Sequence, residues 1–253
     1  MHVLSGTRLV FRRALQQSLR NPAWVVIGLL QPVLYLALFA PLLPRIAGTP
    51  GFPPGDAWQV FVPALLVQLA LFGNAFVGFG LIGEYKAGVV ERMRVTPVSR
   101  VALLLGRSLR DVVVLVVQAV LLVSLAVVFG LRAPVAGVLL GLLLVAVLGL
   151  AVSAASYAIA LRVKDEDAFA PLLNSVFVPL LLLSGILLPM SLAPGWLYTL
   201  SRFNPFVYVV DAERYAFLGE TAGWRVPLGV AVAVGLAVAA VLWGARTFQR
   251  ESA

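Results

Sequence analysis

The chain has 253 residues, of which 61% are hydrophobic and only 12% are charged. A soluble domain is about 45–50% apolar and about 25% charged, because its surface must face water. The composition therefore excludes an ordinary soluble globular protein and predicts an integral membrane protein. The formal net charge of +8 at pH 7 would suggest nucleic acid in a soluble protein. In a membrane protein basic residues hold loops in the cytoplasm, so we expect no nucleic-acid partner.

Two residue types that support much of enzyme and metal chemistry are nearly missing. The sequence contains no cysteine, and its single histidine is His2. Disulfides, thiolate metal sites and cysteine nucleophiles are therefore excluded, and histidine-based catalysis or metal binding is disfavoured. We expect no catalytic residue and no metal site on this chain.

The apolar residues are concentrated in six blocks, at residues 24–43, 58–83, 112–131, 134–161, 168–189 and 226–245. A helix needs about 20 apolar residues to cross a hydrocarbon core of about 30 Å. A spanning segment must also satisfy its own backbone hydrogen bonds, which favours helices here. The sequence therefore predicts an all-α membrane protein, a six-helix bundle that forms a single transmembrane domain over residues 1–253.

Basic residues predict the orientation of this bundle. Most of the 19 Lys and Arg residues fall in residues 1–23, 84–111 and 162–164 and in the tail after residue 245. The positive-inside rule then places both termini in the cytoplasm, which requires an even number of spans. Residues 190–226 face the other side and are rich in aromatic residues. We expect this segment to form extracellular re-entrant or interfacial helices.

Two segments on the predicted cytoplasmic side have distinct patterns. Residues 1–22 place apolar residues on one side of a helix and arginines largely on the other, which is typical of a helix lying in the membrane interface. Within residues 84–100, charges of both signs fall between Glu84 and Arg94, over about three helical turns, and Thr96-Pro97 would end a helix there. This second pattern predicts a short charged helix. Composition alone would favour an ordinary solvated loop, and the order of the residues favours the helix.

Three ordered motifs occur along the chain. They comprise Glu84, Gly88, Glu91, Pro97, Val98 and Arg100; Pro179, Leu183-Ser184-Gly185 and Pro189, followed by residues 193–197; and residues 204–214, NPFVYVVDAER. Their order resembles the ABC-2 type transporter permeases, which are membrane subunits of one class of ATP-binding-cassette exporters. The closest subgroup is the daunorubicin-resistance-like exporters of drugs and natural products. One departure is Gly185-Ile186-Leu187-Leu188, where relatives often carry aromatic residues.

The resemblance implies a separate ATPase that docks on the charged helix at 84–100. The residues expected to couple the two proteins are Glu84, Lys86, Gly88, Glu91, Arg92 and Arg94. The sequence itself requires a separate ATPase if transport is driven by ATP. A P-loop lysine is followed by Ser or Thr, whereas Ala87 follows Lys86 and Asp165 follows Lys164, and the chain has no other lysine.

The resemblance also implies the assembly and its location. ATP and Mg²⁺ would be held by the P-loop ATPase, with no cofactor on this chain. The working unit would contain two permease chains, identical or related, and two ATPase copies, embedded in the lipid of a bacterial plasma (inner) membrane.

The predicted spans contain few polar residues. The candidate substrate pathway comprises Gln31, Gln68, Asn74, Gln118, Asn174 and Ser184. No charged residue is expected near mid-span, since Glu84 and Asp111 are interpreted as lying at span edges. A pathway of apolar groups and scattered amides suits an amphiphilic drug, natural product or lipid-like substrate. Each amide could instead form only an interhelical hydrogen bond, worth about 1 kcal/mol.

Three other functions are compatible with a membrane protein of this size. An ion-coupled secondary carrier usually needs ionisable residues near the midplane, which are not expected here. A membrane-embedded lipid-modifying enzyme would need paired carboxylates or histidines at one interface, and residues 162–167 supply only one acidic run. A non-catalytic assembly subunit would tolerate charge reversal at Glu84 and Glu91.

Gly137 and Gly141 form a G-x-x-x-G pair that allows close helix contact.

Overall fold

The computed structural model describes residues 3–20, 23–39, 41–42, 45, 50, 52–88 and 99–250. Within these ranges the chain forms helices and no strand, which confirms the predicted all-α fold. The elements are α1 (Val3–Arg20), α2 (Ala23–Phe39), α4 (Ala57–Ala75), α5 (Gly78–Lys86), α7 (Arg100–Val128), α8 (Val135–Val163), α9 (Glu166–Leu182), the 3-10 helix η1 (Met190–Leu192), α10 (Gly195–Ser201), α11 (Pro205–Leu218) and α12 (Arg225–Arg250).

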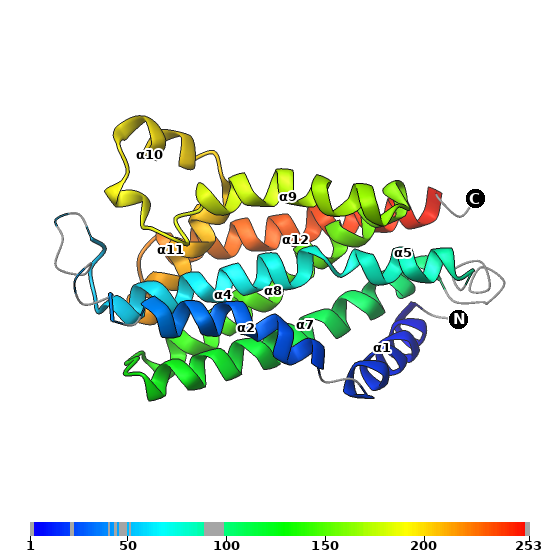
Figure 1. Ribbon diagram of the computed structural model, residues 1–253, viewed down its shortest axis with the longest axis horizontal. Helices are drawn as coiled ribbons and strands as arrows, with labels where there is room; N and C mark the ends of the chain where they lie inside the picture. Colours follow the sequence, from blue (N-terminus) through cyan, green and yellow to red (C-terminus); the bar gives the residue numbers. More distant parts are fainter. Residues whose placement is uncertain are drawn as a thin grey trace.

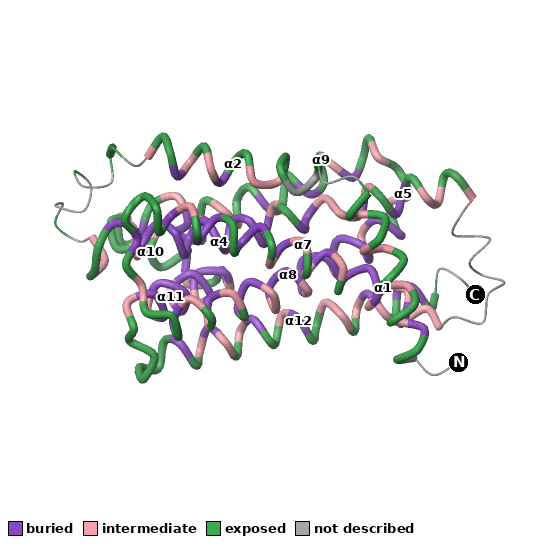
Figure 2. Tube along the Cα trace, turned by 90° about the horizontal axis from the view of Figure 1, so that it is seen from below, coloured by how far each residue is buried: buried purple, intermediate pink, exposed green. Residues whose placement is uncertain are grey.

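The long helices lie side by side along the longest axis of the molecule (Figure 1). Helix α8 occupies the centre, where it contacts α4, α7, α11 and α12. One end of the bundle holds α1 and the last turns of α5 and α12, and we call it the α1 end. The opposite end holds α10 and α11, and we call it the α10 end. The burial pattern follows this arrangement: α8 is largely buried over its second half, whereas α10 is mostly exposed (Figure 2).

Four helical stretches are long and apolar enough to cross a membrane: Ala57–Lys86, Arg100–Val128, Val135–Val163 and Arg225–Arg250. Helix α2 contains a shorter apolar helix, Val26–Phe39. Helix α9 has 17 residues and contains two prolines. Each of the six predicted apolar blocks therefore contains a helix, and the count of six spans stays a prediction.

The second predicted span is interrupted between Ala75 and Gly78. Ser156 of α8 lies at this break and satisfies backbone groups on both sides of it. Its hydroxyl donates to the Ala75 carbonyl oxygen at 2.5 Å and accepts from the Gly78 amide at 3.0 Å. A Cβ on Gly78 would lie 2.9 Å from the Ser156 carbonyl oxygen, so the close approach requires glycine. The break is thus a fixed part of the contact between α4–α5 and α8.

The helix that contains the third predicted span begins at residue 100, 12 residues before the apolar block at 112. Ser99 caps the helix, and its hydroxyl oxygen accepts from the Ala102 amide at 3.2 Å. The first turns of α7 carry charges but pack against α1, where a Cβ on Gly106 would lie 2.7 Å from Val10. Charged residues in these turns therefore belong to the bundle and not to a loop.

The two predicted interfacial segments both contain helices. Residues 1–22 contain α1, and residues 190–226 contain η1, α10 and α11. Helix α10 and its neighbours leave Trp196, Phe203 and Trp224 exposed, at 70%, 82% and 64% of their surfaces. Such exposed rings are typical of a membrane interface. The placement of both segments relative to a bilayer stays a prediction.

Candidate functional site

Three of the six residues predicted to couple to an ATPase lie in the last turn of α5 or just after it. Glu84 and Lys86 are in the last turn of this helix, and Gly88 follows it with a φ of 68°. The left-handed conformation at Gly88 ends the helix in the usual way for glycine. Glu91, Arg92 and Arg94 lie outside the residues that the structure describes.

Glu84 forms an ion pair with Arg107 of α7. The Arg107 Nη2 donates to the Glu84 Oε2, and the two side chains are only 11% and 35% exposed. A charged hydrogen bond in such a partly buried place is stronger than one at the surface. The end of α5 is therefore anchored to the first third of α7. Sequence reasoning missed Arg107, because its partner is 23 residues away in the chain.

A second set of contacts ties α5 to the turn between α8 and α9. The Lys86 Nζ lies 3.5 Å from the Glu166 Oε1, with both side chains about half exposed. The Lys164 Nζ lies 5.2 Å from the centre of the Tyr85 ring. Exposed ion pairs contribute at most about 1 kcal/mol. These contacts therefore add little to the stability of the turn.

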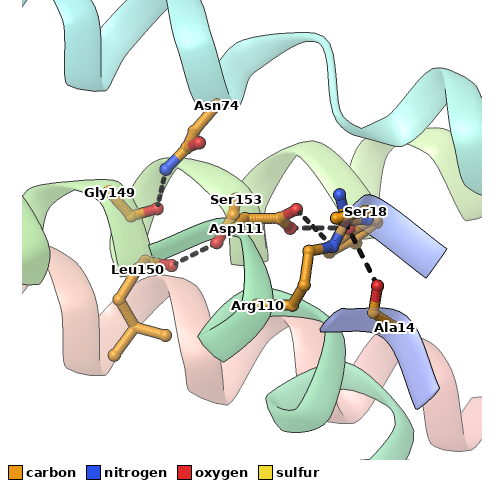
Figure 3. Close-up of polar contacts among 9 residues, drawn as sticks. Ala14, Ser18, Asn74, Arg110, Asp111, Gly149, Leu150 and Ser153 are labelled. Atoms are coloured by element: carbon orange, nitrogen blue, oxygen red, sulfur yellow. Dashed lines mark hydrogen bonds and ion pairs between the residues drawn. The ribbon is translucent and has the colours of Figure 1, made fainter. Parts of the chain in front are cut away.

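A buried polar cluster lies deeper in the bundle, between α7 and α8. The Tyr157 hydroxyl donates to the Asp111 Oδ2 at 2.6 Å, and the Arg110 Nε lies 3.2 Å from the Asp111 Oδ1. Figure 3 shows Asp111 beside Arg110. Asp111 is 3% exposed and is the twelfth residue of the 29-residue α7. Helix α7 begins 11 residues before Asp111, and the expectation that Asp111 lies at a span edge stays a prediction.

The six amide and hydroxyl residues of the candidate pathway fall into different surroundings. Gln31 on α2 and Asn174 on α9 are exposed. Asn74 is buried and donates to the Gly149 carbonyl oxygen at 3.0 Å, as Figure 3 shows. Ser184 is also buried, and its hydroxyl donates to the Leu181 carbonyl oxygen at 2.6 Å.

The two remaining residues of the candidate pathway are buried glutamines. Gln118 on α7 lies against Gly28 of α2, and it is 5% exposed. Gln68 on α4 is 1% exposed, and neither amide atom has a hydrogen-bond partner among the described residues. The structure does not gather the six residues into one lining.

The α10 end contains a small pocket of about 370 Å³, including its open mouth. Its walls come from the ends of α2 and α4, residues 186–189 and α11. The only charged residue in this lining is Arg214, which is 6% exposed. Arg214 belongs to the third sequence motif, but sequence reasoning gave it no role of its own.

Comparison with known proteins identifies the family. A model of the ABC-2 type transporter family matches residues 6–218. The chain is 25% identical over 211 residues to a putative transport permease, ycf38, of Cyanophora paradoxa, covering 83% of this chain and 73% of the relative.

Two further relatives are named as bacterial permeases. One is the probable doxorubicin resistance ABC transporter permease protein DrrC of Mycobacterium tuberculosis strain H37Rv, 25% identical over 219 residues and covering 85% of this chain and 78% of the relative. The other is the probable multidrug ABC transporter permease YbhR of Escherichia coli K12, 26% identical over 176 residues and covering 64% and 44%. The family match covers most of the chain and agrees with the three sequence motifs, so this chain belongs to the ABC-2 type transporter family and is a membrane permease subunit.

Proposed function

We propose that this chain is the membrane half of an ATP-driven exporter of an amphiphilic drug, natural product or lipid-like substrate. In this proposal six helices span a plasma membrane, with both termini and the α1 end in the cytoplasm. The observation that carries the proposal is the family match over residues 6–218. The names of relatives that refer to doxorubicin and multidrug transport support an amphiphilic substrate.

ATP hydrolysis takes place on a partner chain in this proposal. Neither lysine of the sequence can complete a P-loop. ATP and Mg²⁺ then bind the partner ATPase, two copies of which serve a pair of permease chains. The basic residues of the α1 end agree with a cytoplasmic position for this docking face.

The end of α5 is the proposed point where ATPase motion enters the permease. A docking element transmits force only if it is held rigidly to the helices that must move. The Glu84–Arg107 ion pair supplies such a hold on α7. Lys86 and Glu166 add a weaker hold on the α8–α9 turn. Movement of α5 is therefore expected to move the start of α7 and, through the Asp111–Tyr157 hydrogen bond, α8.

Asp111 does not favour the alternative of an ion-coupled carrier. Asp111 lies inside α7, but its two carboxylate oxygens are engaged by Tyr157 and Arg110, so it is not a free ion-binding group. No group of three or more His, Cys, Asp or Glu residues that could hold a metal ion occurs in the described ranges. A metal-dependent lipid-modifying enzyme therefore gains no support from the described residues.

Reconstitution tests the proposal. The permease would be purified together with a P-loop ATPase encoded next to it and placed in inside-out liposomes with doxorubicin as a fluorescent probe. We expect uptake that requires both chains and hydrolysable ATP. Uptake that continues without any ATPase, or that follows an imposed ion gradient instead of ATP, would refute the proposal.

A further inference from the structure

The pocket at the α10 end has a buried floor and an open rim. Val60, Phe61 and Ile186 are at most 8% exposed and line the floor together with Arg214. Phe39 and Phe52 are partly exposed, and Leu188 is 57% exposed, so these side chains line the rim. The lining is almost wholly apolar apart from one guanidinium group.

Arg214 is held in the pocket floor by neutral partners. Its Nε donates to the Val60 carbonyl oxygen at 3.1 Å, and its Nη2 donates to the Gly185 carbonyl oxygen at 2.7 Å. These two bonds fix α11 to α4 and to the turn after α9. A guanidinium has five N–H donors, so donors remain for another acceptor.

No carboxylate lies within 4.0 Å of the Arg214 guanidinium in the part of the chain that the structure describes. Asp211, one turn earlier on α11, forms an ion pair with Arg202 at 3.5 Å, and its charge also offsets part of the lowering that burial causes in the pKa of Arg214. The Glu213 carboxylate lies against Gly141 of α8, where a Cβ would come within 2.6 Å of its Oε2. A buried charge is costly unless it is paired. Asp211 offsets the Arg214 charge only in part, and the remaining N–H donors of the guanidinium suit an anionic group from outside the chain.

The pocket opens where two apolar helices meet the α10 end. Phe39 is the last residue of α2, and Val60 is in the first turns of α4, so the pocket opens at the ends of two membrane helices. Below Phe39, Leu38 and Leu34 of α2 are 65% and 47% exposed. Acyl chains are as apolar as leucine side chains and can therefore cover this face of α2. A lipid lying on this side of α2 would have its headgroup next to the rim.

We propose that this pocket binds one anionic membrane phospholipid, with its phosphate directed to Arg214 and its chains along the exposed leucines of α2. Arginine binds phosphate through several N–H groups at once, which suits a fixed guanidinium. The aromatic rings of Phe39 and Phe61 lie 5.5 Å apart and give the glycerol and upper acyl carbons an apolar wall. This site goes beyond the proposed export function, because lipid binding here requires neither an ATPase nor a cargo.

Native mass spectrometry of the full chain, purified in detergent, tests the proposal. Phosphatidylglycerol and phosphatidylcholine with identical acyl chains would be added separately, and the fraction of protein carrying one lipid would be measured. We expect phosphatidylglycerol to bind about tenfold more tightly than phosphatidylcholine, a difference of about 1.4 kcal/mol. Equal binding of the two lipids would overturn the proposal.

Variants locate the site. Arg214→Gln should reduce phosphatidylglycerol binding to the phosphatidylcholine level, whereas Arg225→Gln should not. Arg225 is a matched control because it is a cation at the same end that lies over Tyr215 and Trp224. Since Arg214 also holds three elements together, Val60→Trp provides a second test that keeps the charge and fills the pocket. If the preference survives Val60→Trp, the lipid binds elsewhere and the proposal is wrong.

The same measurements separate this proposal from the proposed function. A chain that prefers phosphatidylglycerol but shows no ATP-dependent export would refute the function and leave the lipid site standing. A chain that exports doxorubicin but binds both lipids equally would refute the lipid site and leave the proposed function standing.

Discussion

Tyr157 of α8 donates its hydroxyl hydrogen to Asp111 of α7 at 2.6 Å, and both residues are buried. This bond joins two of the longest helices at a depth where water is scarce. Arg110 supplies the second partner of the carboxylate at 3.2 Å. The cluster is therefore a polar contact inside an otherwise apolar interface, and it connects the charged first third of α7 with α8.

Tyr157→Phe should lower the stability of the protein by about 1–2 kcal/mol, because it leaves one oxygen of a buried carboxylate without its donor. The thermal midpoint in detergent, followed by fluorescence-detected gel filtration, measures this loss. Tyr198→Phe, at an exposed tyrosine of α10, is the matched control and should cause no loss. In a double-mutant cycle with Asp111→Asn the two effects should not add. Additive effects would mean that the hydroxyl and the carboxylate do not interact.

Reversing the charge of Glu84 should abolish export while the protein still folds. Glu84→Arg places two cations together at the end of α5, next to Arg107. The combined variant Glu84→Arg with Arg107→Glu restores an opposite pair and should recover a large part of the ATP-dependent flux. Glu166→Arg is the matched control at the weaker, half-exposed pair and should reduce flux less than twofold. A combined variant as inactive as Glu84→Arg would show that the ion pair does not carry the coupling.

The sequence predicted the helices well and their ends less well. Blocks of about 20 apolar residues have a direct physical reason, the thickness of the hydrocarbon core. Helix α7 extends 12 residues before the apolar block at 112–131, over Arg107, Arg110 and Asp111, and hydropathy alone does not show where in this charged stretch the helix begins. Their partners Glu84 and Tyr157 lie 23 and 46 residues away. Only the three-dimensional arrangement reveals that these charges are paired inside the bundle.

The candidate site was predictable only in part. The motif at 84–100 contains Glu84, but the sequence does not show that Arg107 is its ion-pair partner. The motif at 204–214 contained Arg214, but a motif does not tell which side chain is buried beside a pocket. Polar residues are rare in spans, so the sequence singles out both Asn74 and Asn174. Only the structure shows that Asn174 is exposed and Asn74 is buried. That separation depends on which side of each helix faces its neighbours.

Gly137→Ala should destabilise the protein strongly, because helix α11 crosses α8 at this glycine. A Cβ at Gly137 would lie 1.9 Å from the Ala216 carbonyl oxygen, which is backbone and can move only with its helix. Overpacking of this kind typically costs about 1–3 kcal/mol. Gly235→Ala is the matched control on α12, where a Cβ meets no atom within 4 Å. The control should be neutral or gain up to about 1 kcal/mol from helix propensity. Equal thermal midpoints for the two variants would contradict the close approach of α8 and α11.

Glu213 on α11 should make the protein less stable as the pH rises. Its carboxyl group is fully buried, and neither oxygen has a hydrogen-bond partner among the described residues. Helix α11, with 14 residues, is too short to span a membrane. Burial raises the pKa of Glu213 well above its ordinary value. In the unfolded chain Glu213 ionises near its ordinary pKa of about 4.3, whereas in the folded chain it keeps its proton to a higher pH.

Between these two pKa values the folded state binds one more proton than the unfolded state. Stability then falls by up to about 1.4 kcal/mol per pH unit. Glu213→Gln removes this slope, because glutamine resembles the protonated acid and does not ionise. The range from pH 5 to pH 8 lies above the ordinary glutamate pKa of about 4.3. Over this range the thermal midpoint of the variant should therefore rise relative to that of the original protein. Glu220→Gln, at an exposed glutamate just after α11, should leave the pH dependence unchanged. If the original protein and Glu213→Gln follow parallel curves, the Glu213 carboxyl ionises at the same pH in both states and is not desolvated in the folded bundle.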